Sequence, residues 1–341
     1  PAGGRGPPAG GLGGGGGVHL KAANTVLDAF ARAGEARACE RFFERLPELG
    51  LEPNEISWSI VLKAHARSND PGACQAWFAK MAAAGARPSL RAWGVLVDGL
   101  ARAGDLDAAA AAAEAMAAAG AAGSGGGPDG GPNLVILNTL IRGHARQGDA
   151  AGCRRWFAEV LRVGLRPSLQ TYNTVLDGLA LAGDTEEAER WFGAISAEGG
   201  LVPDVVSYAT VMKGHAARGD AAACRRWWGA MQAAGVRGNE IAFTTMMEAH
   251  ARAGEMLEAE AWFDRMQAAG IAPNGVAYGC LITGWKRAGD PKKSAEWREF
   301  RQSTKKKKLP SLSSYKSGGS FSRRPALEKR SRRGIGGVVV L

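Results

Sequence analysis

The sequence lacks the features that mark several common classes of protein. Its 341 residues include only five cysteines and no Cys-x-x-Cys pair, so neither a disulfide framework nor a zinc finger is indicated. No apolar run reaches the roughly 20 residues that a membrane-spanning helix needs. Cysteines that remain free thiols are typical of a protein in a reducing compartment. We therefore expect no membrane partner, metal ion, cofactor or small-molecule substrate.

The excess of positive charge is confined to one end of the chain. Residues 303–341 hold eleven Lys and Arg against Glu328 alone, which equals the net charge of +10 of the whole sequence. The same segment has no His, Cys or Asp, so neither a zinc deaminase signature nor an acidic metal cluster can be assembled there. We expect a basic disordered tail at 303–341 and a chain that is not an enzyme.

A fixed period dominates the rest of the sequence. A turn residue recurs at intervals of 35, 35, 44, 35, 36, 35 and 35 residues, a period typical of stacked repeat arrays. It is glycine or, once, asparagine, the residue types that tolerate a left-handed turn at the end of a helix. Each is followed by Asp or Glu, which suits the start of a second helix, so each unit reads as helix, tight turn, helix. The turn residues are Gly34, Asn69, Gly104, Gly148, Gly183, Gly219, Gly254 and Gly289.

Eight units follow from this period when Leu20 is taken as position 1. They span 20–54, 55–89, 90–133, 134–168, 169–204, 205–239, 240–274 and a partial 275–302, after a Gly- and Pro-rich lead-in at 1–19 that we expect to be disordered. The aromatic residues at position 23 of the units are predicted to form the buried core between neighbouring units. Four of the five Cys stand at position 20 and four of the five His at position 11, one in each unit, which favours packing over a shared metal site.

The third unit departs from the others. Its second helix contains a run of alanines at 108–113 where other units have Trp or Phe, and the Gly-rich residues 121–131 follow it. Alanine favours a helix but buries little apolar area. We therefore predict a weaker interface with the fourth unit, and a hinge at this place.

The unit QTYNTVLDGLALAGDTEEAERWFGAISAEGGLVPD at 170–204 resembles the pentatricopeptide repeat, and the two units after it share its pattern. Period, turn glycine, aromatic second helix and a closing Pro-Asn or Pro-Asp coincide over residues 20 to about 302. The tetratricopeptide repeat, a protein-binding unit of roughly 34 residues, has a Trp-Leu-Gly-Tyr pattern that is absent here. The resemblance implies a P-type array of about eight units with an all-α fold, a right-handed superhelical α-solenoid of helix-turn-helix repeats.

The resemblance also implies single-stranded RNA binding with one base per unit, read by the side chains at positions 5 and 35. An amide or hydroxyl there can meet the Watson–Crick edge of an unpaired base. The expected base-reading residues are Asn24, Asn54, Ser59, Ser89, Asn133, Asn138, Ser168, Asn173, Asp204, Asn239, Thr244 and Asn274. Gly94 and Ala209 at position 5 of the third and sixth units offer no side-chain hydrogen bond.

Two further positions have roles in the pentatricopeptide repeat family, which this sequence resembles. Position 2 clamps the bases, and its aliphatic residues here are Ile56, Val135, Val206, Ile241 and Val276. Position 13 contacts phosphate, and its arginines here are Arg32, Arg67, Arg102, Arg146, Arg252 and Arg287. By the family's pattern, the first seven units would prefer, from the 5′ side, a pyrimidine, weakly A, no determined base, C, U, weakly A, and A.

The expected function is sequence-selective RNA binding in organellar RNA processing, stability or translation, together with other RNA-processing proteins. The resemblance implies a mitochondrion or plastid, with the cytosol or nucleus as the alternative. A protein-binding helical scaffold is the alternative function, favoured by the zero net charge of the sequence outside the tail. The tail itself reads as a non-specific RNA anchor, a nuclear address or a solubilising segment.

Overall fold

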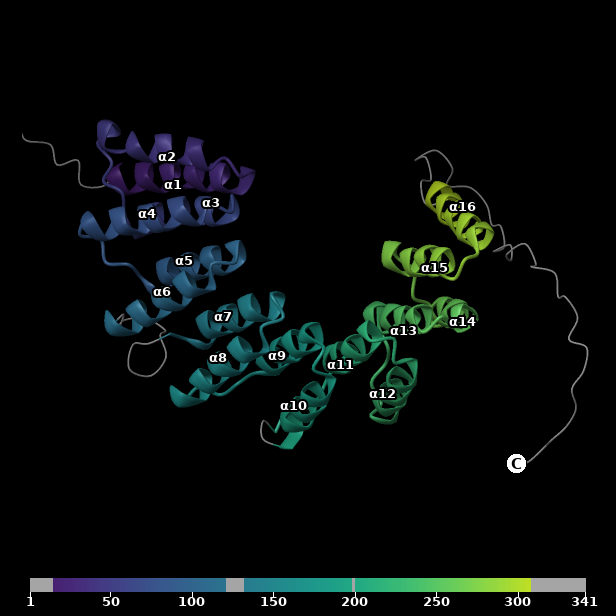
Figure 1. The fold of residues 1–341 in the computed structure, drawn as a ribbon. Helices are drawn as coiled ribbons and strands as arrows, with labels where there is room; N and C mark the ends of the chain where they lie inside the picture. Colours follow the sequence, from purple (N-terminus) through teal and green to yellow (C-terminus); the bar gives the residue numbers. More distant parts are fainter. Residues whose placement is uncertain (1–14, 121–131, 198–199, 308–341) are drawn as a thin grey trace, which may run out of the picture.

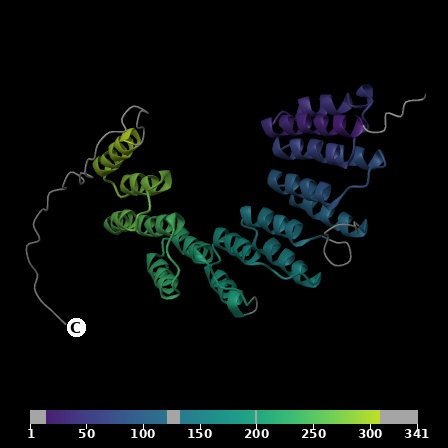
Figure 2. The ribbon, with the colours of Figure 1, turned by 180° about the vertical axis from the view of Figure 1, so that it is seen from behind.

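The computed structural model describes residues 15–120, 132–197 and 200–307, which form eight pairs of antiparallel helices stacked in an open arc (Figure 1). The first helices of the units line the inner side of the arc in both views (Figure 2). They are α1 (Gly15–Ala33), α3 (Glu55–Arg67), α5 (Leu90–Ala103), α7 (Leu134–Arg146), α9 (Leu169–Ala182), α11 (Val205–Ala217), α13 (Glu240–Arg252) and α15 (Gly275–Arg287).

The second helices form the outer side of the arc. They are α2 (Ala36–Glu44), α4 (Pro71–Ala83), α6 (Leu106–Ala118), α8 (Ala150–Arg162), α10 (Thr185–Ala197), α12 (Ala221–Ala233), α14 (Met256–Ala268) and α16 (Pro291–Lys307), with one short 3-10 helix, Pro47–Leu49, after α2. The described residues are all-α, so the predicted solenoid of helix-turn-helix units is confirmed. Its handedness stays a prediction. Within the described part of the chain, no helix is both long and apolar enough to span a bilayer.

Local sequence explains where the helices of each unit begin and end. All eight turn residues have positive φ, and Asn69, with φ of 57°, is the only residue other than glycine that does so within the described ranges. The acidic residue that follows caps the second helix in six units, where its carboxylate accepts a backbone N–H three residues further on. The two glutamates, Glu35 and Glu255, cap without such a bond.

The inner helices approach one another closely because position 10 is mostly glycine. A Cβ on Gly178 would lie 3.1 Å from the Cα of Ala145 on the preceding inner helix and 2.7 Å from the Cys153 sulfur. Gly99, Gly143, Gly214 and Gly284 meet the alanine at position 12 of the preceding unit in the same way. The backbones of successive inner helices lie close together, whereas successive outer helices meet through large aromatic side chains such as Phe157 and Trp191. The inner side is therefore the shorter, and the array curves towards it.

The buried core runs through the third unit. One apolar cluster extends from Ala23 to Val211, and a second begins at Tyr208 in α11. At the predicted hinge, Leu106, Ala113 and Met116 of α6 are buried, although no aromatic contact is found between the Phe78–Trp93 pair and the rings around Phe157 in the described residues. The junction therefore has a continuous core of smaller side chains, and the hinge stays a prediction.

The first and last helices extend five residues beyond the predicted units. α1 begins at Gly15 rather than at Leu20, and α16 continues to Lys307 rather than ending at 302, so residues 15–19 and 303–307 are helical instead of disordered. The glycines at 15–17 disfavour a helix by roughly 1 kcal/mol each, which made this extension unpredictable from sequence. The rest of the lead-in (1–14), the Gly-rich insert (121–131) and the rest of the tail (308–341) lie outside the described residues.

The close approach of the inner helices predicts opposite effects for two glycine substitutions. Gly178→Ala should lower stability by about 1–3 kcal/mol, because its methyl group would press on the backbone of α7. Gly193→Ala, on the exposed side of α10 with nothing within 4 Å of the added Cβ, should raise stability by up to about 1 kcal/mol. Urea unfolding followed by circular dichroism measures both, and equal midpoints for the two variants would contradict the close packing.

Candidate functional site

The residue at position 35 of each unit begins the inner helix of the next unit. In seven units its side-chain oxygen accepts the backbone N–H of the third helical residue, at 2.8–3.4 Å. These N-cap residues are Asn54, Ser89, Asn133, Ser168, Asp204, Asn239 and Asn274. Such caps satisfy backbone donors that would otherwise lack a partner, so the residues expected to read bases also hold the helices in place.

The residue at position 5 lies against this cap in two of the units. Asn173 donates from Nδ2 to Oδ1 of Asp204 at 3.3 Å, and its own Oδ1 accepts from Ser207 Oγ at 2.7 Å. Asn24 makes the same two bonds, to Asn54 at 3.4 Å and from Ser57 at 2.7 Å. The structure therefore brings positions 5 and 35 together as hydrogen-bonded pairs in the first and fifth units.

The other expected pairs differ in this respect. Ser59 Oγ and Asn138 Oδ1 are buried and have no hydrogen-bond partner in the described part of the chain. Thr244 bonds to carbonyls of its own helix, at 3.0 Å from Glu240 and 2.9 Å from Ile241. Asn274 donates to the Glu240 carboxylate instead. A direct bond between positions 5 and 35 is therefore a property of particular units and not of the whole array.

The aliphatic residues at position 2 are exposed to solvent. Ile56, Val135, Val206, Ile241 and Val276 expose 42–69% of their surface, although they belong to the large apolar type that forms the core elsewhere. Positions 2, 5, 9 and 13 are three or four residues apart and so share one face of each inner helix. This shared face, which we call the reading stripe, combines an exposed aliphatic side chain, a polar group and charged residues.

The charges of the reading stripe alternate from unit to unit. Position 9 carries an acid in the first, third, fifth and seventh units and a base in the second, fourth and sixth: Asp28, Lys63, Asp98, Arg142, Asp177, Lys213 and Glu248. The acids and bases of neighbouring units attract one another, as for Lys213 and Asp177 at 2.7 Å and Lys63 and Asp28 at 3.8 Å. The Arg32 hydrogen bond, together with the charges of Lys63 and Arg67, holds the pKa of Asp28 below its usual value although partial burial opposes this.

This alternation divides the predicted phosphate-contacting arginines into two groups. Arg32, Arg102 and Arg252 are bound by the acid four residues earlier on the same helix, the last at 2.6 Å from Glu248. Arg67, Arg146 and Arg287 follow Lys63, Arg142 and Thr283 instead, and the described residues provide no ion pair for them. All six arginines are exposed, but only the second group keeps its full charge available.

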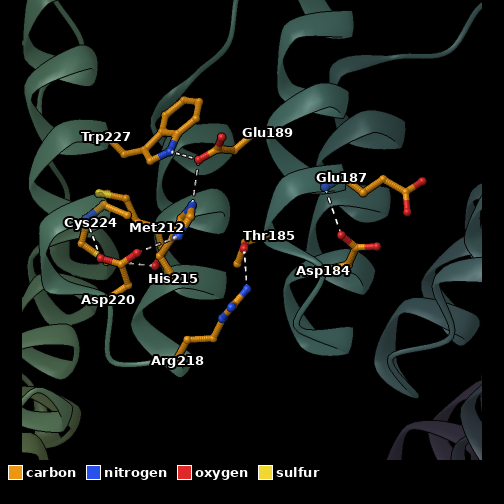
Figure 3. A network of polar contacts seen from close by, with 11 residues as sticks. Asp184, Thr185, Glu187, Glu189, Met212, His215, Arg218, Asp220, Cys224 and Trp227 are labelled. Carbon is orange, nitrogen blue, oxygen red and sulfur yellow. Dashed lines mark hydrogen bonds and ion pairs between the residues drawn. The ribbon is translucent and has the colours of Figure 1, made fainter.

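The histidines belong to contacts between helices, as predicted. Figure 3 shows Glu189 of α10 accepting from Trp227 Nε1 and facing His215 Nε2, both at 3.0 Å, while Asp220 lies 3.8 Å from the other imidazole nitrogen. Position 21 carries a glutamate with the same role in two other units. Glu40 contacts His65 and Trp77 of the next unit, and Glu260 accepts from Trp285 and Trp297 of the next unit. Sequence reasoning missed these glutamates. The sequence does show that they recur at position 21, and that each unit that follows has ring N–H groups at positions 11 and 23.

The cysteines at position 20 are buried and pack as predicted. Cys39, Cys74, Cys153 and Cys224 each donate to the carbonyl oxygen twelve residues earlier, with sulfur–oxygen distances of 3.3–3.8 Å. Burial raises the pKa of each thiol to about 12, which makes them poor nucleophiles and metal ligands. No group of three or more His, Cys, Asp or Glu suited to a metal ion occurs among residues 15–120, 132–197 and 200–307.

Comparison with protein families matches most of the units. Residues 132–181 and 238–287 match the PPR repeat family, residues 170–199 match the PPR repeat, and residues 19–123 match the pentacotripeptide-repeat region of PRORP. These matches together cover more than half of the chain. No curated protein matches it in sequence.

Comparison with solved structures gives the same fold. The pentatricopeptide repeat protein PPR10 in complex with an 18-nt psaJ RNA element is 21% identical with a TM-score of 0.55, over 84% of this chain and 45% of that one. PPR10 from maize is 23% identical with a TM-score of 0.51, over 84% and 43%. The chain therefore spans less than half the length of these structures. Its family matches and its fold agree, and the chain belongs to the pentatricopeptide repeat family.

Proposed function

We propose that this chain binds single-stranded RNA sequence-selectively along the inner side of its arc, with one base for each unit. The observation that carries this proposal is the reading stripe, which recurs on successive inner helices. In five units the stripe offers an apolar contact at position 2, and in most units it offers a hydrogen-bonding group at position 5 beside a polar cap at position 35. Helical repeats that read one base each use two or three side chains in this way.

The exposed aliphatic residues support a ligand with flat apolar faces. Five such exposed side chains, in the second, fourth, sixth, seventh and eighth units, are unfavourable in water by about 25 cal/mol for each Å² left uncovered. The face of an unpaired base could cover each of them, while the polar edge of the base meets positions 5 and 35. Gly94 and Ala209 lack the polar group, so we propose that the third and sixth units contribute little selectivity.

The phosphate contacts are proposed to come mainly from alternate units. Lys63 with Arg67 and Arg142 with Arg146 place two like charges one helical turn apart, without an acid on the same stripe. Arg102 and Arg252 instead form ion pairs with Asp98 and Glu248, whose negative charge offsets theirs on the same stripe. Attraction to the RNA backbone then comes from separation of charge along the inner surface, although the net charge outside the tail is zero.

PPR10, a fold neighbour, was crystallised with an 18-nt psaJ RNA element, which supports RNA as the ligand class for this chain. We further propose that the chain acts sterically on an organellar transcript, in a mitochondrion or plastid, without catalysing a reaction itself. A protein-binding scaffold is the competing function, and the zero net charge of the sequence outside the tail favours it.

Selection from a randomised RNA pool followed by sequencing tests the proposed function. We expect enrichment of a sequence that contains C-U-A-A, opposite the fourth to seventh units, with the A opposite the sixth unit the least strongly selected. The enriched RNA should lose affinity when the C or the U is changed. A pool that stays flat, with binding that depends only on salt, would favour a scaffold with a basic tail.

Two paired variants test the alternate phosphate contacts. Arg142→Gln with Arg146→Gln removes two exposed charges for which the described residues provide no ion pair, and should lower the slope of log affinity against log salt by about 1.4, since each contact to a single strand contributes about 0.7. Asp98→Asn with Arg102→Gln removes a neutral pair of similar exposure and should leave the slope nearly unchanged. Equal loss in the two double variants would contradict this assignment.

A further inference from the structure

The polar group at position 5 is held in a defined orientation in the first and fifth units. Asn173 is bonded on both sides of its amide, by Asp204 through Nδ2 and by Ser207 through Oδ1, at 3.3 Å and 2.7 Å. Both partners belong to the start of α11, the next inner helix. Ser207 stands at position 3 of that unit, a position to which the family resemblance gives no role.

Chemistry fixes which way this amide faces. The Asp204 carboxylate can only accept hydrogen bonds, and its Oδ1 already accepts the Ser207 backbone N–H at 2.9 Å. The Asn173 atom that faces it must therefore be the nitrogen. In the first unit, Asn54 Oδ1 is identified as oxygen in the same way, because it accepts the Ser57 backbone N–H at 3.1 Å.

The fourth unit also has asparagine at position 5, but within the described residues the Oδ1 atom of this Asn138 does not accept a hydrogen bond as that of Asn173 does. There the cap is Ser168, and the Ser168 hydroxyl lies 3.0 Å from the Thr171 hydroxyl. The Thr171 hydroxyl also accepts the backbone N–H of Ser168, at 3.1 Å. Both hydroxyls are thus engaged with each other and with the backbone. Ser207 likewise accepts the Asp204 backbone N–H at 3.2 Å and lies 3.0 Å from Asp204 Oδ1, but it also lies 2.7 Å from Asn173 Oδ1, its shortest contact. Asn138 Oδ1 is left buried without a partner in the described part of the chain, so no hydrogen bond to that oxygen holds the amide in one orientation.

We propose that Ser207 and Ser57 are positioning residues that set base selectivity in the unit before their own, by fixing the Asn173 and Asn24 amides. This inference rests on the RNA binding proposed above. A fixed amide presents one free Nδ2–H and one free Oδ1 lone pair in constant directions. An amide that turns over exchanges donor and acceptor, and so loses the distinction between uracil, with N3–H and O4, and cytosine, with N3 and N4–H. The unit with Asn173 is therefore sharply selective, and the unit with Asn138 less so.

The orientation can be tested in the full chain without RNA. Nuclear magnetic resonance with 15N-labelled asparagine measures exchange of the side-chain Nδ2 protons, with the Asn173 signal assigned by its loss in Asn173→Ala. We expect Ser207→Ala to speed exchange at Asn173 about fivefold, the effect of one hydrogen bond, with Asn24 unchanged. Thr171→Ala is the matched control, because it removes the equivalent capping hydroxyl without a bond to position 5. Unchanged exchange in Ser207→Ala would overturn the proposal.

The effect on selectivity is measured with RNAs that differ only in U or C at the fifth nucleotide. Ser207→Ala should reduce the ratio of the two affinities about fivefold, and Ser207→Thr should restore it because the hydroxyl remains. Thr171→Ala should leave the ratio at the fourth nucleotide unchanged. A wild-type chain that binds no RNA refutes the proposed function, while the exchange measurement still decides the orientation. RNA binding with an unchanged ratio in Ser207→Ala overturns this inference alone.

Discussion

The close approach of successive inner helices is the constraint on which the rest of the structure depends. It requires that position 10 carry almost no side chain, as at Gly178, whose Cα faces the backbone of Ala145. The backbones of successive inner helices approach closely, whereas successive outer helices meet through large aromatic side chains such as Phe157 and Trp191, and for this reason the array curves. The same approach brings the capped end of one inner helix against position 5 of the previous one in the first and fifth units, so that two units together form the polar site there.

The cap explains why position 35 uses so few residue types. Asn, Asp and Ser are the only residues found there, and they are the residues that best begin a helix. A side chain that must accept a backbone N–H has an oxygen in a fixed place, and the remaining polar atoms can face a ligand. Stability and the proposed recognition therefore use the same atoms, and a change of base preference at position 35 is limited to substitutions that still cap.

The sequence was informative wherever a feature is local to one unit. The left-handed turns, including Asn69, the acids that begin the second helices, and the packing of cysteine and histidine all follow from residue type and position. The aliphatic side chains at position 2 were singled out by the family resemblance, their exposure was found in the structure, and their role as base clamps stays a prediction. Contacts between units were harder to predict, since spacing within one unit does not show which side chain of the next unit it meets. The glycine and alanine contacts at positions 10 and 12, the Glu189 contacts and the Ser207 bond to Asn173 are all of this kind. Pairing of Arg102 with Asp98 was visible as a spacing of four residues, but its consequence for phosphate contact required the structure.

The most direct test of the central claim is photo-crosslinking with a series of RNAs, each carrying a single 4-thiouridine at one of seven successive nucleotides. Mass spectrometry then identifies the crosslinked peptide. If each unit binds one base through its reading stripe, the crosslink should move by one inner helix for each nucleotide, from α1 at the 5′ end towards α13. Crosslinks that fall on the outer helices or on residues 308–341, whatever the position of the label, would contradict this account.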